Sequence, residues 1–480
     1  MTNKMSSKLS IICLLPLLLL CGCNAVIGGN EAKNSFTQVT DYDLSFDESV
    51  SDSSYDIESS TFIELNNKNA KITKGGTYIL EGTLENASII VDAKKDADVW
   101  LVLNNVNISS SQLPGIYIKS GNNVKITLAD GSTNSFSDSS SETNDSNDTD
   151  ALIYSETDLI INGNGELNLN SDYKHGIVSK DDLIITGGTF NIETKGQGLR
   201  GKDRLKISGG NFNLVTHKDS LKSDNYEDEY KGYVYICGGS FDITSYADAI
   251  YGHSLVRIDD GSFKLKTIKS ETADSFKAIK SKNEIVISDG KFEIESEDDA
   301  IHSDKDITIN GGKLKIRSKD DGIHSNAKVE INDGNITVEA HEGIESTFVL
   351  INGGDIDITA SDDGVNAGQK VKDYEPTFEM NDGNLTIETG YGDSDGIDSN
   401  GYIYINGGTI DITGQSPFDY ILGAEFNGGT IIVNGNEIEE ISNIYVEPVP
   451  DEEESEEDYE DLDDQDYYDD QSAVEDQIEY

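Results

Sequence analysis

A tight turn that ends in glycine recurs along about half of the chain, and its spacing restricts the fold more than any other feature. The turns include TGG at 186–188, SGG at 208–210, NGG at 310–312 and NDG at 332–334, and the pattern continues to residue 429. The steps between turns cluster near 22 residues, with longer steps where the chain carries insertions. A fixed period of this length is typical of a solenoid in which each repeat packs only on its neighbours.

Each turn lies between segments in which apolar and polar residues alternate. Residues 307–309 (ITI) precede a turn and residues 314–316 (LKI) follow it, and period-two alternation with β-branched residues predicts strands. A third short strand is expected in a repeated motif, SEDDAIHSDK at 296–305 and SKDDGIHSNA at 318–327. The sequence therefore predicts an all-β fold, a single-stranded parallel β-helix with about 22 residues and three short strands per coil. The buried residues expected in the third strand are Ile301, Ile323, Ile344, Val365 and Ile397.

Acidic residues occupy the same place in successive copies of this motif. Equivalent residues of stacked coils lie about 4.8 Å apart, and two unit charges at that distance repel by about 1 kcal/mol even in water. Such a column needs cations, raised carboxyl pKa values or good solvation. Because Ca²⁺ prefers several oxygen ligands in loose geometry, we expect at least one Ca²⁺ here; the alternative is a solvated acidic face that binds nothing specific. The predicted metal ligands are Asp298, Asp299, Asp320, Asp321, Glu342, Asp362, Asp363 and Asp395.

Other residue types also repeat in register. His302 and His324 follow the buried isoleucines, so they should point outward one above the other, and we expect two solvent-exposed histidines rather than a transition-metal pair. Asparagines that precede the turns should bond along the stack as a structural ladder. Cys237 holds the same position and is expected to be a buried or turn thiol. The ladder asparagines are Asn310, Asn332, Asn352, Asn381, Asn406 and Asn427.

The charge and the N-terminus indicate partners and location. The 480-residue chain has a formal net charge of −55, which excludes nucleic acid because an acidic surface cannot displace phosphate counterions. Its first residues place two lysines before a short apolar run, which predicts a signal peptide rather than a membrane span. The run ends in LCGC, which resembles a bacterial lipobox and predicts lipidation of Cys23 on the extracellular face of the cell membrane. An ordinary secreted protein is the alternative.

The chain is predicted to divide into four segments. Residues 1–22 form the signal peptide, residues 23–60 the lipidated cysteine and a linker, and residues 61–445 the β-helix. Residues 446–480 contain 18 Asp and Glu and no Lys or Arg, a composition typical of disorder. Once Cys23 is modified only Cys237 remains in the mature chain, so no internal disulfide is expected.

Several motifs together resemble a known family. KGGTYILEGTL, DLIINGNGELNL, KHGIVSKDDLIITGGTFNI, GLRGKDRLKISGG and DSLKSDN are similar to the carbohydrate-binding domain family typified by a clostridial cell-surface protein, over roughly residues 61–435. The resemblance implies a right-handed, pectate-lyase-like β-helix that binds calcium and plant polysaccharides, including polygalacturonate and cellulose. Ser220 and Ala249 stand where the family pattern favours glycine after the acid, which weakens the expectation of metal binding in those coils.

The expected function is calcium-dependent binding of an acidic or plant cell-wall polysaccharide by a monomeric surface lipoprotein. One alternative is a calcium-dependent lyase, in which Lys222 or Lys280 would remove the proton α to a uronate carboxylate. Another is a structural adhesin or spacer that binds no glycan. No paired catalytic signature singles out a base, so no catalytic residue is predicted. The residues expected to contact sugar are Lys222, Tyr251, Lys280, His302 and His324.

Overall fold

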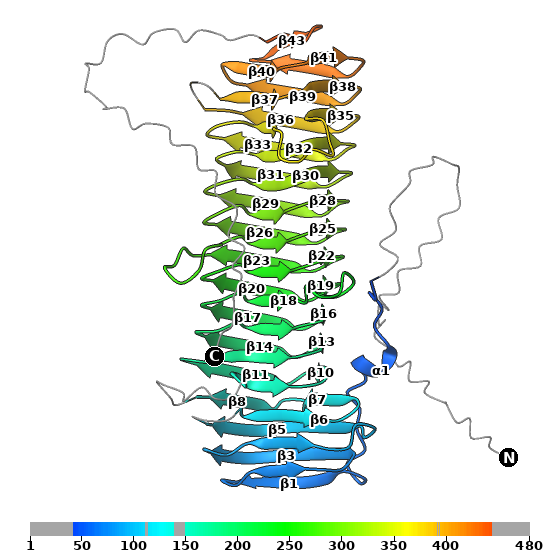
Figure 1. Cartoon of the computed structure of the whole chain (residues 1–480), viewed down its shortest axis with the longest axis vertical. Helices are drawn as coiled ribbons and strands as arrows, with labels where there is room; N and C mark the ends of the chain where they lie inside the picture. The colour runs from blue at the N-terminus through cyan, green and yellow to red at the C-terminus, as the bar shows by residue number, and fades with distance from the viewer. Residues whose placement is uncertain (1–41, 111–113, 139–148, 391, 393, 444–480) are drawn as a thin grey trace, which may run out of the picture. The chain divides into compact units, whose positions relative to one another are not determined.

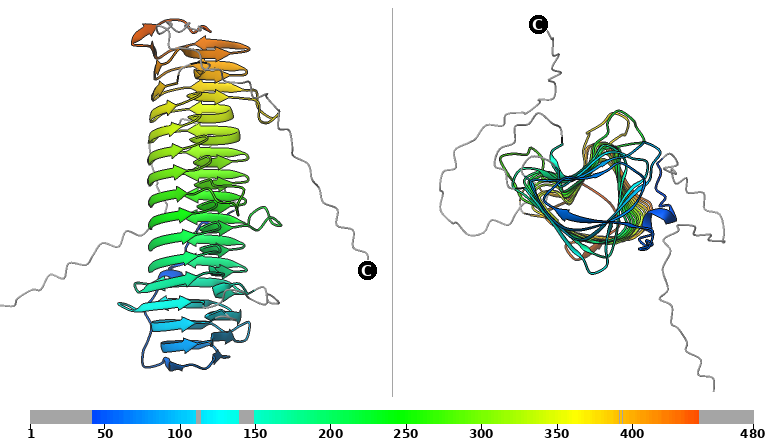
Figure 2. Two further views of the ribbon diagram at one scale, coloured as in Figure 1. Left: turned by 90° about the vertical axis from the view of Figure 1, so that its left-hand side faces the viewer. Right: turned by 90° about the horizontal axis from the view of Figure 1, so that it is seen from below.

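The described chain winds into one column of stacked coils. The computed structural model describes residues 42–110, 114–138, 149–390, 392 and 394–443, and Figure 1 shows their coils stacked along the long axis. Leu183 pairs with Leu205 and Ile307 with Val329, so equivalent residues are 22 positions apart. The end-on view in Figure 2 shows the coils superposed on one outline. The predicted parallel β-helix is confirmed; the predicted signal peptide, Cys23 and the acidic tail lie outside the described residues.

Sheet 1 contains the strands that precede the glycine turns. All its pairings are parallel, which is possible because a full coil separates neighbouring strands. Its strands are β1 (Thr61–Asn66), β3 (Gly76–Glu85), β5 (Val99–Ser109), β7 (Val124–Leu128), β10 (Leu159–Gly163), β13 (Asp182–Ile185), β16 (Arg204–Ile207), β19 (Tyr233–Ile236), β22 (Leu255–Ile258), β25 (Glu284–Ile287), β28 (Asp306–Ile309), β35 (Thr377–Met380), β38 (Tyr402–Ile405) and β41 (Gly423–Phe426).

Sheet 2 contains the strands that follow the glycine turns, and the long β3 and β5 continue into it. Its last two strands pair antiparallel. Its strands are β8 (Thr133–Ser137), β11 (Glu166–Ser171), β14 (Thr189–Thr194), β17 (Asn211–Thr216), β20 (Ser240–Ser245), β23 (Ser262–Thr267), β26 (Lys291–Ser296), β29 (Lys313–Ser318), β31 (Asn335–Ala340), β33 (Asp355–Ala360), β36 (Asn384–Glu388), β39 (Thr409–Thr413), β42 (Thr430–Val433) and β43 (Asn436–Ile438).

Sheet 3 is built from the motif with the acidic residues, and seven of its strands are only three residues long. Two strands, β30 (Ile323–Ile331) and β32 (Ile344–Ile351), run on from sheet 3 into sheet 1. The others are β2 (Ala70–Ile72), β4 (Ile89–Asp92), β6 (Ile116–Ser120), β9 (Ala151–Ser155), β12 (His175–Ser179), β15 (Leu199–Gly201), β18 (Leu221–Ser223), β21 (Ile250–Gly252), β24 (Ile279–Ser281), β27 (Ile301–Ser303), β34 (Val365–Ala367), β37 (Asp395–Ser399) and β40 (Ser416–Tyr420).

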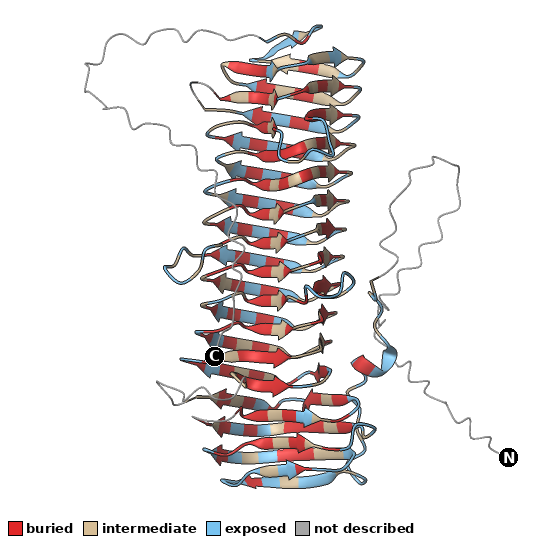
Figure 3. Cartoon of the chain, in the orientation of Figure 1, coloured by how far each residue is buried: buried red, intermediate tan, exposed pale blue. Residues whose placement is uncertain are grey.

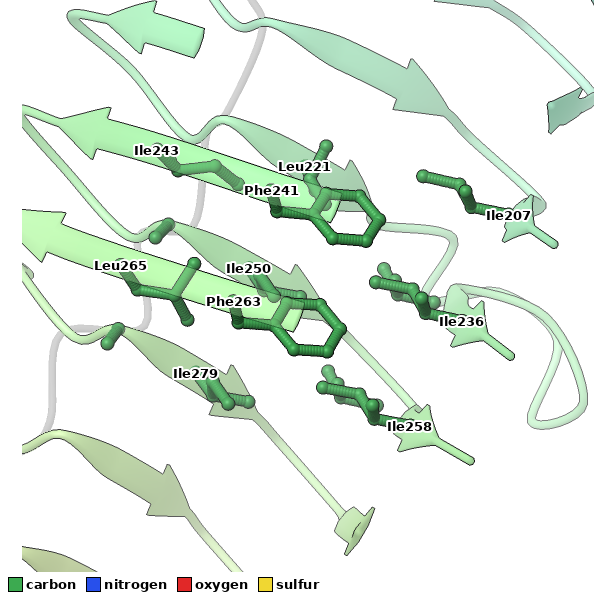
Figure 4. Packing of buried hydrophobic residues seen from close by; sticks show 14 of the residues in the cluster. Ile207, Leu221, Ile236, Phe241, Ile243, Ile250, Ile258, Phe263, Leu265 and Ile279 are labelled. Atoms are coloured by element: carbon green, nitrogen blue, oxygen red, sulfur yellow. The ribbon is translucent and has the colours of Figure 1, made fainter. Parts of the chain in front are cut away.

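The three sheets enclose one apolar core. Buried and exposed residues alternate along the strands, as the red and pale blue bands in Figure 3 show. In sheet 2 the inward residues of successive coils form a ladder of phenylalanines, with ring centroids 4.7 Å apart for Phe212 and Phe241 and 4.8 Å for Phe241 and Phe263. Figure 4 shows the Phe241 and Phe263 rings beside isoleucines of the other two sheets. Each coil therefore buries its apolar face on its neighbours, as the 22-residue period predicts.

The glycine turns carry the predicted asparagine ladder. Gly312 has φ +98°, a backbone conformation that residues other than glycine rarely adopt. In the turns that follow, each asparagine amide donates to the asparagine one coil earlier, for example Asn352 Nδ2 to Asn332 Oδ1 at 2.8 Å. The bonds run without interruption from Asn310 to Asn427 at 2.8–2.9 Å, so the ladder is confirmed. Cys237 is buried, as expected.

Residues 42–56, here called the strap, pack along the outside of sheet 1 and include the short helix α1 (Glu48–Ser51), visible beside the lower coils in Figure 1. The rings of Tyr42 and Tyr233 lie 5.2 Å apart and Asn162 Nδ2 donates to the Val50 carbonyl at 2.9 Å. Part of the segment predicted as a linker is therefore packed against the β-helix. Within the described residues, no helix has the length and apolar character needed to span a bilayer.

Candidate metal and carbohydrate site

The outer surface of sheet 3 gathers titratable side chains into one column. Each short strand places one residue outward between two buried ones, as His324 lies between Ile323 and Ser325. Parallel register stacks these outward residues. The column runs Arg200, Lys222, Tyr251, Lys280, His302, His324, Glu345, Asn366, Asp398 and Asp419.

A second column lies three residues earlier in each coil, in the turn before the strand. The Gly322 amide donates to the Glu342 carbonyl at 2.9 Å and the Gly343 amide to the Asp363 carbonyl at 3.0 Å, so these turns are also in register. The predicted stacking of acidic residues is confirmed, and Asp298, Asp320, His341 and Asp362 form a partial third column beside it. The three columns are here called the sheet 3 strip. The second column contains Asp219, Asp248, Lys277, Asp299, Asp321, Glu342, Asp363 and Asp395.

The N-terminal part of the strip is basic and aromatic. The ammonium groups of Lys222 and Lys280 lie 5.2 and 5.9 Å from the centroid of the Tyr251 ring, one on each neighbouring coil. Both lysines also contact the second column, Lys222 with Asp219 at 2.7 Å and Lys280 with Asp248 at 3.4 Å. Sequence analysis expected Lys222, Tyr251 and Lys280 to contact sugar, and the structure brings the three together on one surface.

In the middle of the strip the protein supplies its own cations to the carboxylates. Lys277 Nζ lies 2.6 Å from Asp298 and 3.0 Å from Asp299. Burial alone raises the pKa of Asp299, but a hydrogen bond with His302 and the charge of Lys277 hold it well below its ordinary value. Asp299, which is only 3% exposed, is therefore ionised and compensated. This lysine stands in a position that the sequence pattern otherwise fills with acids.

The two histidines lie one above the other, as predicted, with ring centroids 4.7 Å apart. The prediction that they are solvent-exposed is wrong, because their side chains are only 13% and 15% exposed. His302 Nδ1 lies 2.6 Å from Asp299, and His324 Nδ1 lies 2.6 Å from Asp321 and 2.8 Å from Glu345. The rings point outward from the strands, but each contacts the other ring and the carboxylates of Asp299, Asp321 or Glu345, which leaves little of its surface exposed.

The C-terminal part of the strip has a surplus of carboxylates. Burial, followed by the charges of Glu345, Asp321 and Asp363, raises the pKa of Glu342 to about 8. Burial and neighbouring carboxylates likewise raise the pKa of Asp363 to about 7. No Lys, Arg or His of the described chain lies within ion-pair distance of either carboxylate. The repulsion expected for a column of acids is therefore relieved here by protonation.

Two buried oxygen atoms in this part have no hydrogen-bond partner among the described residues, Glu342 Oε2 and Asn366 Oδ1. They belong to adjacent coils, and Asn366 Nδ2 lies 3.4 Å from Glu342 Oε1. One coil further on, carboxylate oxygens of Asp395, Asp398 and Asp419 lie within 4.8 Å of one another. Oxygen atoms that receive no hydrogen bond are suitable ligands for a hard divalent cation such as Ca²⁺. The donor set from Glu342 to Asp419 therefore fits Ca²⁺ better than the compensated carboxylates at Asp299.

The structure adds residues that sequence analysis missed. Glu345, Asn366, Asp398 and Asp419 lie on the strip but were not predicted as ligands. The spacing in the sequence could have identified the first three. Each comes three residues after a predicted acid, as His302 follows Asp299 and His324 follows Asp321. The predicted metal and sugar roles of all these residues stay predictions.

The fold and the sheet 3 strip define a parallel β-helix with a long polar surface along one sheet. A family model described as carbohydrate-binding domain-containing protein matches residues 66–322 and 312–436. The chain belongs to this carbohydrate-binding domain family. It is 40% identical over 216 residues to a carbohydrate-binding domain-containing protein of Acetivibrio thermocellus, across 44% of this chain and 76% of that protein. A solved polysaccharide lyase-like protein from C. thermocellum, a gadolinium derivative, is 33% identical with a TM-score of 0.42, across 49% of this chain and 96% of that one.

Proposed function

We propose that this protein is a lipid-anchored surface protein that captures acidic plant cell-wall polysaccharide, such as polygalacturonate, along the sheet 3 strip with the help of Ca²⁺. One observation carries the proposal: buried oxygen acceptors of Glu342 and Asn366 lack donors, beside carboxyl groups whose pKa values are raised. A bound Ca²⁺ would satisfy these oxygens and leave ligand positions for a uronate carboxylate.

The charge along the strip supports an acidic rather than a neutral ligand. Lys222 and Lys280 flank Tyr251 in the N-terminal part, where uronate carboxylates can meet ammonium groups and a sugar ring can meet an aromatic side chain. In the C-terminal part Glu342 and Asp363 would repel a uronate once they lose their protons, and a bridging cation both favours their ionised forms and removes that repulsion. One extended polyanion can therefore use both parts in different ways.

A Ca²⁺ titration by calorimetry tests the metal site. The double variant Glu342→Gln/Asp363→Asn removes two carboxylates and should weaken Ca²⁺ binding at least about tenfold, since one lost ligand of this kind costs a charge-assisted contact of about 1.5–3 kcal/mol. The matched control Asp357→Asn/Glu388→Gln makes the same charge change on exposed residues of sheet 2 and should bind like the parent. Equal affinity in the parent and the strip variant would place any Ca²⁺ elsewhere.

Pull-down on polygalacturonate and on cellulose, with Ca²⁺ and with EDTA, tests the ligand. We expect Ca²⁺-dependent retention on polygalacturonate, lost in the strip variant and kept in the control. Retention on neither polymer would favour the spacer alternative, and retention unaffected by EDTA would contradict a calcium-dependent site. Absorbance of an unsaturated uronate product in the same mixture would instead identify a lyase.

The surface location is a separate proposal that rests on the LCGC motif before Cys23. Expression of the full chain with Cys23→Ala should move the protein from the membrane fraction to the medium, because several acyl chains anchor a lipoprotein firmly and one residue carries them. A parent chain that already accumulates in the medium would support the secreted alternative without changing the proposal for glycan binding.

A further inference from the structure

The two stacked histidines face buried carboxylates with the same ring nitrogen. His302 Nδ1 and His324 Nδ1 both point to the second column, and the carboxylates that they meet are only 3–6% exposed. Ligand atoms of Asp299, His302 and His324 lie within 4.8 Å of one another, as do those of Asp321, His324 and Glu345. His324 belongs to both sets. These five residues are here called the histidine cluster.

The other ring nitrogen of each histidine is also held. His302 Nε2 lies 3.1 Å from a carboxylate oxygen of Asp304, and His324 Nε2 lies 3.2 Å from Asn326 Oδ1. The ionised Asp304 can only accept, so His302 Nε2 carries a hydrogen. Metal-binding histidines commonly donate their second N–H to a carboxylate or carbonyl oxygen, which fixes the tautomer and aims the other nitrogen at the ion. The histidine cluster has this second contact on both rings.

With that tautomer, Nδ1 of each ring presents a lone pair to a carboxylate oxygen at hydrogen-bond distance. Two acceptors face each other in this way only when a cation, either a proton or a metal ion, lies between them. The charges agree: five carboxylates, Asp298 and Asp304 included, and the three ammonium groups of Lys277, Lys282 and Lys370 sum to −2 when both imidazoles are neutral. Two protons or one divalent ion would neutralise the cluster.

We propose that the histidine cluster is a binding site for a divalent transition metal of the zinc class, separate from the Ca²⁺ site. Mixed imidazole and carboxylate donors suit zinc, copper, nickel or cobalt, whereas Ca²⁺ takes oxygen ligands. Ligand atoms around a tetrahedral zinc lie about 3.3 Å apart, so the observed contacts would need to open by less than about 1 Å. The ion enters from the outer side of the strip, where both rings keep partial exposure.

The site lies directly between the basic and the acidic parts of the strip. His302 follows Lys280, and Glu345 follows His324, in successive coils. A transition metal at this point would add positive charge where the lysines of the first two columns end. The proposal does not depend on Ca²⁺ or on glycan binding, and the metal can be tested alone.

Co²⁺ is the probe, because its visible absorption reports ligand type and geometry. With saturating Ca²⁺ present, we expect the mature chain to bind one Co²⁺ with a spectrum typical of nitrogen and oxygen ligands, and Zn²⁺ to displace it. His302→Gln and His324→Gln should each weaken Co²⁺ binding at least about tenfold. His217→Gln is the matched control, since that histidine stacks on Tyr246 outside the strip and meets no carboxylate of the cluster.

Asp304→Asn keeps every proposed ligand and changes the second contact of His302, together with the ion pair of Asp304 with Lys282 at 2.7 Å. It should weaken Co²⁺ binding by about 10–100-fold, which also keeps the test decisive if a histidine variant fails to fold. Three results would overturn the proposal: no stoichiometric Co²⁺ binding, an unchanged spectrum and affinity in His324→Gln, or displacement of Co²⁺ by millimolar Ca²⁺. The last would place the ion among oxygen ligands.

Discussion

At the scale of single residues, Glu342 and Asp363 have the largest pKa shifts in the C-terminal part of the strip and dominate its response to pH. Their carboxyl groups are partly buried beside other acids, so the folded protein holds protons that an unfolded chain releases. The pKa of Glu342 rises from 4.5 to about 8 and that of Asp363 from 3.8 to about 7. Because the folded state binds more protons in this interval, the free energy of unfolding falls as pH rises through it.

We therefore expect the melting temperature of the metal-free protein to fall between about pH 5 and pH 8, with most of the loss restored by Ca²⁺. Glu342→Gln mimics the protonated group and should flatten this dependence, whereas the exposed Glu388→Gln should leave it unchanged. Thermal unfolding in EDTA across that pH range measures both. Parallel curves for the parent and Glu342→Gln would contradict the assignment.

At the scale of elements, polar and aromatic ladders join the coils at two different places. The asparagine ladder was predicted from the sequence because its members precede the recurrent glycine turns, whose period fixes their stacking. The phenylalanine ladder in sheet 2 follows from the same period. Both ladders consist of one contact repeated from coil to coil. Because each coil of a solenoid contacts only its neighbours, a substitution in one coil should remove only the contacts of that coil.

Asn352→Ala removes two ladder hydrogen bonds, one to Asn332 and one from Asn381. It should lower the free energy of unfolding by about 1–2 kcal/mol, at about 1 kcal/mol for each bond. Asn427→Ala, at the end of the ladder, loses the bond to Asn406 and should cost about half as much. Denaturant unfolding compares the two variants, and an equal or larger loss for Asn427→Ala would contradict a ladder in which each bond contributes separately.

Phe241→Ala opens a cavity between Phe212 and Phe263, where the ring is 2% exposed. We expect a loss of about 3–5 kcal/mol in the free energy of unfolding. Phe62→Ala is the control, because that ring is 65% exposed and its truncation should change stability by no more than about 0.5 kcal/mol. Similar unfolding midpoints for the two variants would show that the ladder is not packed as described.

At the scale of the whole molecule, the strap links the start of the described chain to coils far along the β-helix. Phe46 packs on Tyr235 with ring centroids 5.8 Å apart, and Lys206 places its ammonium 5.0 Å from the Phe46 ring. Phe46→Ala should lower stability by about 1 kcal/mol and increase the rate of proteolytic cleavage within residues 42–56. The exposed Glu48→Ala is the control, and equal cleavage rates would mean that the strap is not held by this contact.

How much the sequence could predict differs between these scales for physical reasons. The coils and the acidic column repeat at one period, so the stacking of residues such as Asp321 and Asp363 follows from their spacing in the sequence. The strap does not repeat, and its contact between Val50 and Asn162 joins positions more than a hundred residues apart. The burial of His302 depends on its contacts with Asp299 and His324, which alternation along a strand does not specify.

The central claim is that the sheet 3 strip binds an acidic polysaccharide through Ca²⁺, and a crystal structure with Ca²⁺ and an oligogalacturonate tests it most directly. The account predicts anomalous density for Ca²⁺ among oxygens of Glu342, Asp363 and Asn366, with the glycan running along the strip toward Tyr251. Glycan on sheet 2, beside the groove lined by Asn168, Asn191 and Asn213, with no ion at Glu342, would contradict it.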